Sequence, residues 1–121
     1  MPVRGIRGAV VSQGDQVEHI LNATRELLQA IMDANPELVP EDIASVIFTT
    51  TEDISAAYPA KAARQLGWLN VPLLCAREIP VPGSLSSCIR ILVHWNTDLP
   101  QSEIRSIYLG EAVSLRPDLW E

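Results

Sequence analysis

The sequence of 121 residues is short of several features that would point to familiar classes of protein. It contains only two cysteines, Cys75 and Cys88, which form no CxxC pair and lack the spacing of metal ligands. No apolar run approaches the roughly 18 residues that a membrane-spanning helix needs. No apolar segment typical of a signal peptide follows Met1. We therefore expect a cytoplasmic protein with reduced thiols, no bound metal and no contact with a membrane.

Charge and residue type narrow the choice of partner. The net charge of −6 argues against a nucleic-acid partner, which requires a basic surface. The sequence also shows no Ser/His/Asp set and no phosphate-binding loop. Of its nine basic residues, eight are arginine and only Lys61 is lysine. Arginine is favoured where a planar fork of donors binds a carboxylate or phosphate, so the positions of the arginines indicate where an anionic ligand would bind.

Hydrophobic periodicity predicts elements in the order strand, helix, strand, helix, strand, strand, strand. Asp15 is expected to cap the first helix, and Gly67 to end the second. This order predicts an α/β (α+β) domain over residues 1–121, with one mixed five-stranded sheet and two main helices on one face. The other face would be exposed, so we expect an oligomer. The strands are expected at 3–11, 45–51, 69–79, 88–95 and 108–115, and the helices at 15–35 and 59–66.

Arg90 stands in the most apolar predicted strand, between Ile89 and Ile91. Strand alternation places it on the opposite face from these two neighbours, together with Cys88 and Leu92. A guanidinium in such a strand is costly unless it is paired or faces a ligand. The pattern leaves both interpretations open, a structural ion pair with a neighbouring strand or a contact with an anionic ligand.

Four further residues are candidates for the same site. Arg4 and Arg7 have opposite parity in a glycine-containing strand, so one would point into a site while the other meets solvent, although solvation is the default for either. Glu78 lies at a strand end, where it would pair with Arg90, bind a ligand hydroxyl or remain an exposed edge charge. Cys75 has the opposite parity to Glu78, so it would reach the same ligand through its backbone N–H.

The second predicted helix carries two cations near its start, Lys61 and Arg64, which are three residues apart and share a face. Cations there oppose the helix dipole, which hints at a nearby anion, although a solvated face is more common. The two histidines suggest no catalysis: His19 is expected at the surface and His94 in packing.

Taken together, these segments resemble the trimeric, non-helical class of chorismate mutases. The resemblance implies a pseudo-α/β barrel, in which three sheets pack at the centre of a homotrimer and the sites form between adjacent subunits. It also implies the rearrangement of chorismate to prephenate without a cofactor. The matching stretches follow one another over nearly the whole chain, at 4–9, 58–61 with Arg64, 71–75 with Glu78, 88–90, 96–98 with 100–101, and 113–119.

The resemblance also implies a role for each matching residue. Arg90 would face the ether oxygen and a carboxylate of chorismate, and Arg7 and Tyr108 would also bind the substrate. Glu78 would take the ring hydroxyl, with help from Cys75. Arg90, Glu78 and Arg7 would form the catalytic set, and the rearrangement would need no nucleophile, general base or metal.

The remaining matches would complete the pocket. Lys61, Arg64 and Arg116 would attract or cover the dianion at its mouth. Tyr58 stands where many members of the class have phenylalanine, which should be tolerated. The residues implied to line the pocket are Tyr58, Ala60, Leu73, Leu74 and Leu115.

Two other functions stay open at this point. Small trimeric imine deaminases have a similar architecture and also hold a carboxylate with an arginine, but they would not require the set of Arg7, Glu78 and Tyr108. A non-catalytic trimer that binds a metabolite of the aromatic pathway would bind chorismate without converting it.

Overall fold

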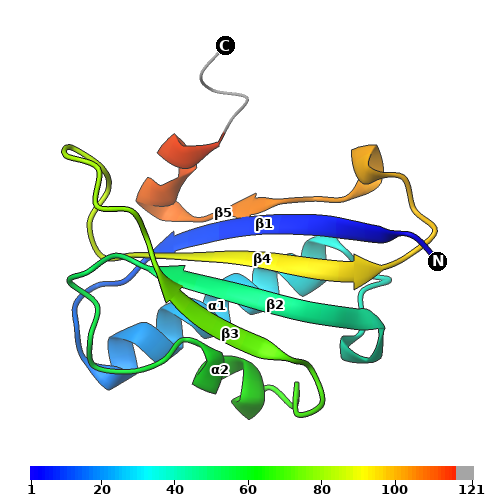
Figure 1. Cartoon of the computed structure of the whole chain (residues 1–121), viewed down its shortest axis with the longest axis horizontal. Helices are drawn as coiled ribbons and strands as arrows, with labels where there is room; N and C mark the ends of the chain where they lie inside the picture. Colours follow the sequence, from blue (N-terminus) through cyan, green and yellow to red (C-terminus); the bar gives the residue numbers. More distant parts are fainter. Residues whose placement is uncertain (117–121) are drawn as a thin grey trace.

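The computed structural model describes residues 1–116, so positions 117–119 of the matching stretch lie outside the described residues. Its five strands form one mixed sheet in the order β3-β2-β4-β1-β5 (Figure 1). The central strand β4 (Cys88–Asn96) runs antiparallel to β1 (Val3–Val11) and β2 (Ile43–Thr50). The outer strands β3 (Leu73–Arg77) and β5 (Ile107–Tyr108) run parallel to β2 and β1, respectively. The predicted mixed five-stranded sheet is confirmed.

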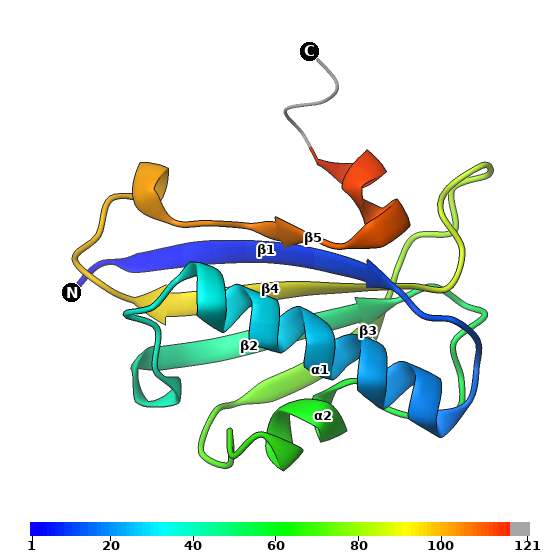
Figure 2. The ribbon, with the colours of Figure 1, turned by 180° about the vertical axis from the view of Figure 1, so that it is seen from behind.

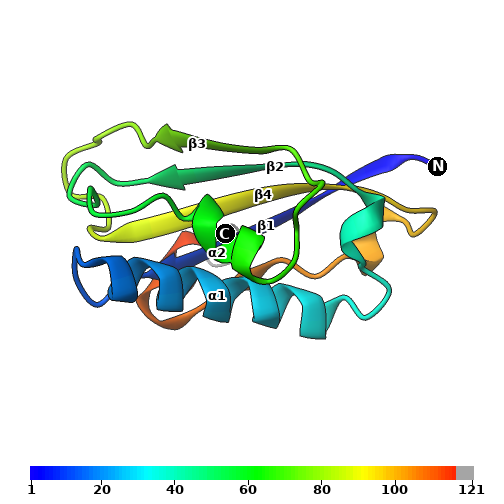
Figure 3. The same cartoon turned by 90° about the horizontal axis from the view of Figure 1, so that it is seen from below.

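Two α-helices, α1 (Val17–Ala34) and α2 (Ala60–Gln65), cover one face of this sheet (Figures 2 and 3). The helix α1 links β1 to β2 and α2 links β2 to β3, which places both on the same side. The apolar stripe of α1 packs on the sheet through Ile20, Leu27, Leu28 and Ile31, all fully buried. Within residues 1–116, no helix has the length and apolar character needed to cross a membrane.

The two faces of β4 differ in the way that its alternating sequence predicts. Ile89, Ile91, Val93 and Trp95 are buried against the helices, whereas Arg90 on the other face is only half-buried. Cys88 lies on the face of Arg90 but is buried as well. The 3-10 helix η3 (Gly110–Leu115) folds over this end of the sheet, where its Ala112 forms a small cluster with Cys88 and Ala9.

The ends of the two helices give one correction and one confirmation. Asp15 does not cap α1, because Gln16 occupies that position and the Asp15 carboxylate instead accepts hydrogen bonds from Ser55 and Ala56. Gly67 follows α2 at a φ of +95°, which a residue with a side chain rarely adopts. The N–H groups of residues 67 and 68 bond back to the carbonyls of residues 64 and 63, the pattern of a glycine-terminated helix.

Two predicted strands are wrong in extent. The strand expected over 69–79 spans only Leu73–Arg77, because the apolar Trp68 and Val71 are buried from the turn that follows α2. The strand expected over 108–115 ends at Tyr108 and continues as η3, whose Ala112 is buried on the sheet. Two shorter 3-10 helices, η1 (Pro40–Asp42) and η2 (Gln101–Glu103), precede β2 and β5.

Candidate active site

The sheet face opposite the two α-helices of residues 1–116 contains a cavity of about 230 Å³. It is lined from β1 by Arg7, from β4 by Arg90, from β5 by Tyr108 and from the end of β3 by Glu78. Thr49 of β2 completes the polar lining, and Ile47 and Leu92 supply apolar surface. Three strands and the residue after a fourth therefore bring two guanidinium groups, a carboxylate and a phenol to one place.

Two of the charged residues that line this cavity, Arg90 and Glu78, are in contact. The Arg90 Nε lies 3.6 Å from the Glu78 Oε2, which is close enough for an ion pair but too long for a hydrogen bond. Accordingly, this buried Nε has no hydrogen-bond partner within residues 1–116. The other Glu78 oxygen, Oε1, accepts a hydrogen bond of 2.7 Å from the Thr49 hydroxyl. The carboxylate is thus shared between a neutral donor on β2 and a cation on β4.

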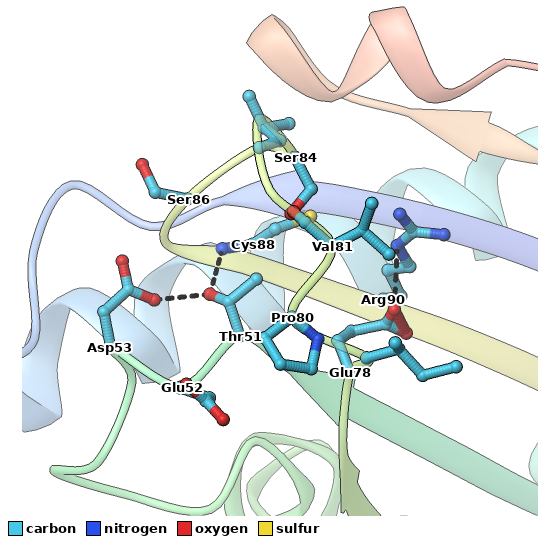
Figure 4. A pocket seen from close by; sticks show the side chains of 12 residues that line it. Thr51, Glu52, Asp53, Glu78, Pro80, Val81, Ser84, Ser86, Cys88 and Arg90 are labelled. Carbon is cyan, nitrogen blue, oxygen red and sulfur yellow. Dashed lines mark hydrogen bonds and ion pairs between the residues drawn. The ribbon is translucent and has the colours of Figure 1, made fainter.

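A second cavity of about 250 Å³ adjoins the first, and Glu78 and Arg90 line both (Figure 4). Its other walls are the segment 51–53 after β2 and the loop 79–86 before β4. At its floor, the Thr51 hydroxyl accepts a hydrogen bond from the Cys88 N–H and donates one to Asp53 (Figure 4). Asp53 in turn accepts bonds from the N–H and hydroxyl of Ser87, a residue at a φ of +50°.

Two ionisable groups beside the second cavity have perturbed pKa values. The pKa of Asp53 is lowered, first by the hydrogen bond from Thr51 and then by those from Ser87, because donors stabilise the charged carboxylate. The pKa of the Cys88 thiol is raised, mainly by burial, so the group is a neutral thiol at physiological pH. Within residues 1–116, no three His, Cys, Asp or Glu side chains come together as metal ligands.

The two arginines of β1 separate as their parity requires. Arg7 is exposed on the open face and lines the cavity. Arg4 has the opposite parity, and its Nε donates a hydrogen bond of 2.9 Å to the Leu99 carbonyl. Tyr108 lies beside Arg7 because β5 pairs with β1 at the parallel register of Tyr108 with Ala9. The structure therefore brings together Arg7, Tyr108, Glu78 and Arg90, four of the residues to which the resemblance assigns polar contacts with the substrate.

The other implied site residues lie at the far edge of the sheet, around β3 and α2. Tyr58 and Cys75 line a separate cavity of about 350 Å³ there, and Lys61 and Arg64 are exposed on α2. Ala60 is buried, at 3% exposed. None of these five lines the cavities of Arg90 within the described part of the chain.

The remaining implied site residues are three leucines and one arginine, on β3 and at the end of η3. Leu73 packs against the main core, whereas Leu74 is 62% exposed on the other face of the edge strand. Leu115 packs beside the cluster of η3 on the open face, and Arg116 follows it half-buried. Leu73 therefore turns away from the cavity of Arg90, while Leu115 lies on the same sheet face as that cavity.

Thr49 and Asp53 are the two residues that reasoning from the sequence missed. Thr49 shares a strand face with Ile47 and is paired directly with Arg90 across β2 and β4. Alternation along β2 was the available signal for it. Asp53 gave no such signal, because it lies in a connector whose path the sequence does not predict.

An open sheet face with two arginines, a carboxylate and a phenol around one cavity defines a protein that binds a small anionic molecule with hydroxyl groups. Residues 3–119 match the family model of chorismate mutase type I, and the chain belongs to that family. The match confirms three predictions made from the sequence: the family, the chorismate mutase activity and the class of enzyme, an isomerase.

Individual relatives agree with the family match. The chain is 58% identical over 117 residues to chorismate mutase AroH of Thermus thermophilus, covering 97% of this chain and 96% of the relative. It is 45% identical over 120 residues to chorismate mutase AroH of Bacillus subtilis, covering 98% and 94%. Among solved structures, a chorismate mutase from Clostridium thermocellum superposes with a TM-score of 0.88 at 43% identity, covering 91% of this chain and 97% of that one.

Proposed function

We propose that the chain converts chorismate to prephenate in the cavity of Arg7, Glu78, Arg90 and Tyr108. The observation that carries the proposal is that two guanidinium groups and one carboxylate line the same cavity on an open sheet face, with the Arg90 guanidinium paired to the Glu78 carboxylate. Chorismate has two carboxylates, an ether oxygen and a ring hydroxyl. Arginines suit the carboxylates and the ether oxygen, and the Glu78 carboxylate suits the hydroxyl as an acceptor.

The reaction is an intramolecular rearrangement in which a C–O bond breaks and a C–C bond forms, so atoms and electrons balance within one molecule. Negative charge grows on the ether oxygen as the C–O bond lengthens. A guanidinium held at this oxygen stabilises the transition state more than the ground state. Arg90 is assigned this role, because it lines the cavity from the central strand β4 and carries its charge beside Glu78. Arg7 and Tyr108 would hold the reactive conformation of the substrate.

We further propose that the site is completed in a homotrimer, where Tyr58, Lys61 and Arg64 of one subunit face the Arg90 cavity of the next. Their position on the other side of the sheet edge supports this, since they cannot reach that cavity in their own chain. The open face also carries exposed apolar side chains that an assembly would cover, including Leu74 at 62% and Ile79 at 81% exposed.

The other implied residues take their places in the same proposal. The backbone N–H of Cys75 would help to hold the ring hydroxyl, while Ala60, Leu73, Leu74 and Leu115 would line the pocket and Arg116 would close over the dianion. The protein would act in the cytoplasm, which its two free thiols support. We expect no partner among nucleic acids, because the net charge is −6.

The first test is the loss of chorismate absorbance on adding purified protein in buffer with EDTA, with prephenate identified as the product. Conversion without metal supports the proposed reaction. Tight binding of chorismate without conversion by a folded trimer would reject it in favour of a binding protein.

A second test examines the shared site. Sedimentation velocity should give a trimer, and the variants Arg90→Gln and Arg64→Glu should each lose activity. When the two variants are unfolded together and refolded, mixed trimers should regain part of the activity, because some sites then combine an intact Arg90 with an intact Arg64. Failure to regain activity in well-formed mixed trimers would contradict the shared site.

A further inference from the structure

Among residues 1–116, Thr49 is the one polar residue lining the cavity of Arg7, Glu78, Arg90 and Tyr108 that has no role among the substrate contacts proposed above. It is half-buried on β2, directly opposite Arg90 in the antiparallel register of β2 and β4. Its position is rigid, because β2 is hydrogen-bonded on both sides, to β4 and to β3. A hydroxyl there has a fixed place relative to both charged groups at the centre of the cavity.

The contacts of Glu78 show what this hydroxyl does. Glu78 comes directly after β3, and its N–H is anchored to the Thr50 carbonyl at 2.9 Å. The side chain beyond Cα has several rotatable bonds, and the Thr49 hydroxyl restrains it through the bond to Oε1. Oε2 is then left 3.6 Å from the Arg90 Nε, outside hydrogen-bond range.

Without the Thr49 hydroxyl, Glu78 and Arg90 would be expected to form a bidentate pair. An arginine and a carboxylate that are free to move form two parallel hydrogen bonds, which are short and charge-assisted. Such a pair would compensate the charge of Arg90 and occupy both oxygens of Glu78. In the structure, Oε1 accepts the hydrogen bond from Thr49 and Oε2 lies 3.6 Å from the Arg90 Nε, so the two residues are not joined by a bidentate pair of hydrogen bonds.

We propose that Thr49 is a positioning residue for the reaction: its hydroxyl holds Glu78 apart from Arg90, so that the guanidinium stays available to the ether oxygen and Oε2 to the ring hydroxyl. The inference rests on the proposed function and adds to it a group that need not touch the substrate. Loss of the hydroxyl should therefore affect both binding and turnover.

Two variants at this position separate the hydroxyl from the shape of the side chain. Thr49→Val removes the hydroxyl at nearly equal volume, and Thr49→Ser keeps it. We expect Thr49→Val to lower kcat/KM by roughly tenfold or more, as for a hydrogen bond to a charged group, with KM raised and kcat lowered. Thr49→Ser should stay within about threefold of the wild type. Equal loss in both variants would overturn the proposal.

Whether Thr49 acts by positioning Glu78 is tested by repeating Thr49→Val in a Glu78→Ala background. The substitution should then have little further effect on the residual kcat/KM, because the group that it positions is gone. An undiminished effect in that background would show that Thr49 acts independently of Glu78 and would overturn the proposal.

A measurement without substrate keeps this inference distinct from the proposed function. Urea unfolding gives the free energies of unfolding of the wild type, Thr49→Val, Glu78→Ala and the double variant. The effects of the two substitutions on this free energy should not add up, because Thr49 and Glu78 are in contact. Additive stabilities would contradict the contact itself. A wild-type protein that does not convert chorismate would overturn the proposed function, and the positioning role with it, even if the stabilities are non-additive.

Discussion

Arg90 and Glu78 form an ion pair at 3.6 Å whose two side chains remain 39% and 24% exposed. Solvent screens a pair of this kind, and its contribution to the free energy of unfolding is at most about 1 kcal/mol. The pair is therefore a poor device for holding the sheet together. Its place at the junction of two cavities indicates instead that both groups are kept accessible for a ligand.

Replacing Arg90 by glutamine should leave the fold intact and remove most of the activity. The neutral side chain cannot balance the charge that grows on the ether oxygen. By analogy with the loss of one oxyanion donor, kcat should fall by about 10²–10³. Chorismate absorbance gives kcat, and a thermal melt provides the control for folding. Turnover within a few-fold of the wild type would reject the role of Arg90.

Gly8 lies where β1, β5 and α1 meet, and the space around it has no room for a side chain. A Cβ there would lie 3.0 Å from the Ile107 carbonyl oxygen and from Ile91 Cγ2, and 3.1 Å from Ile31 Cδ1. Gly8→Ala should therefore destabilise the protein by about 1–3 kcal/mol, as other overpacked sites do.

The matched control for this prediction is Gly5→Ala on the same strand, where a Cβ would meet only Leu92 Cδ1 at an ordinary 3.6 Å. This variant should be neutral or slightly stabilising, by less than about 1 kcal/mol, because alanine loses less backbone entropy in a strand. Urea unfolding measures both. Equal stabilities of the two variants would contradict the close packing at Gly8.

Arg77 fixes the connector between β2 and α2 from its outer side. Its Nη1 donates hydrogen bonds to the Thr50 hydroxyl and to the carbonyls of Thr51 and Ile54. This connector leads to Tyr58, which the proposal places at the pocket of an adjacent subunit. Arg77→Met should raise KM by up to about tenfold with a smaller change in kcat, because the lost bonds position the pocket and not the reacting atoms.

The control for Arg77 is Arg105→Met, at an exposed arginine whose side chain makes no hydrogen bond within residues 1–116. Hydrogen exchange should speed up in residues 51–58 of the Arg77 variant and stay unchanged in the control. Unaltered exchange and KM in the Arg77 variant would show that the connector does not depend on this side chain.

Strand β4 shows how far the sequence predicts this fold. Its strict alternation assigns Ile91 to the core and Arg90 to the open face, because successive side chains in a strand point in opposite directions. The same apolar signal misled at Val71 and Ala112. These residues are buried from a turn and a 3-10 helix, and a short apolar run does not reveal which kind of backbone carries it.

The residues of the candidate site also fall into those that a sequence pattern predicts and those that it does not. Parity and strand ends pointed to Glu78, to Arg90 and to one of Arg4 and Arg7, and the resemblance selected Arg7. One sheet face brings Arg7, Glu78 and Arg90 together. Thr49 was not distinguished, because threonine is common in strands for reasons unrelated to a site. Tyr58 and Arg64 could be connected with that site only by resemblance, since no pattern within one chain encodes a contact between subunits.

Two hydrogen-bonded aspartates, Asp15 and Asp53, should make the free energy of unfolding depend on pH in the acidic range. The pKa values of Asp15 and Asp53 lie below the ordinary 3.8, chiefly because hydroxyls of Ser55 and Thr51 donate to their carboxylates. The unfolded chain therefore binds protons at a higher pH than the folded one. The stabilisation is fully present above the ordinary pKa and is lost as the pH falls through the lowered values of the folded state.

Urea unfolding between pH 2 and 6 tests this dependence. The wild type should lose stability as the pH falls below about 4. Asp53→Asn should show a shallower loss, since it has no carboxylate to protonate. The same comparison applies to Asp15→Asn. A slope identical to that of the wild type in both variants would mean that other groups cause the acid sensitivity.

The last prediction concerns Cys88, which shares a strand face with Arg90. Its side chain is 1% exposed, and burial raises the pKa of its thiol. A thiolate so close to Arg90 would compensate the positive charge that the reaction needs, whereas the neutral thiol leaves this charge intact. In the variant Cys75→Ser, which retains only Cys88, alkylation at pH 8 should be at least roughly tenfold slower than in urea. Rapid alkylation of the folded variant would show that Cys88 is accessible and ionised. A neutral thiol would then not be what leaves the charge of Arg90 uncompensated.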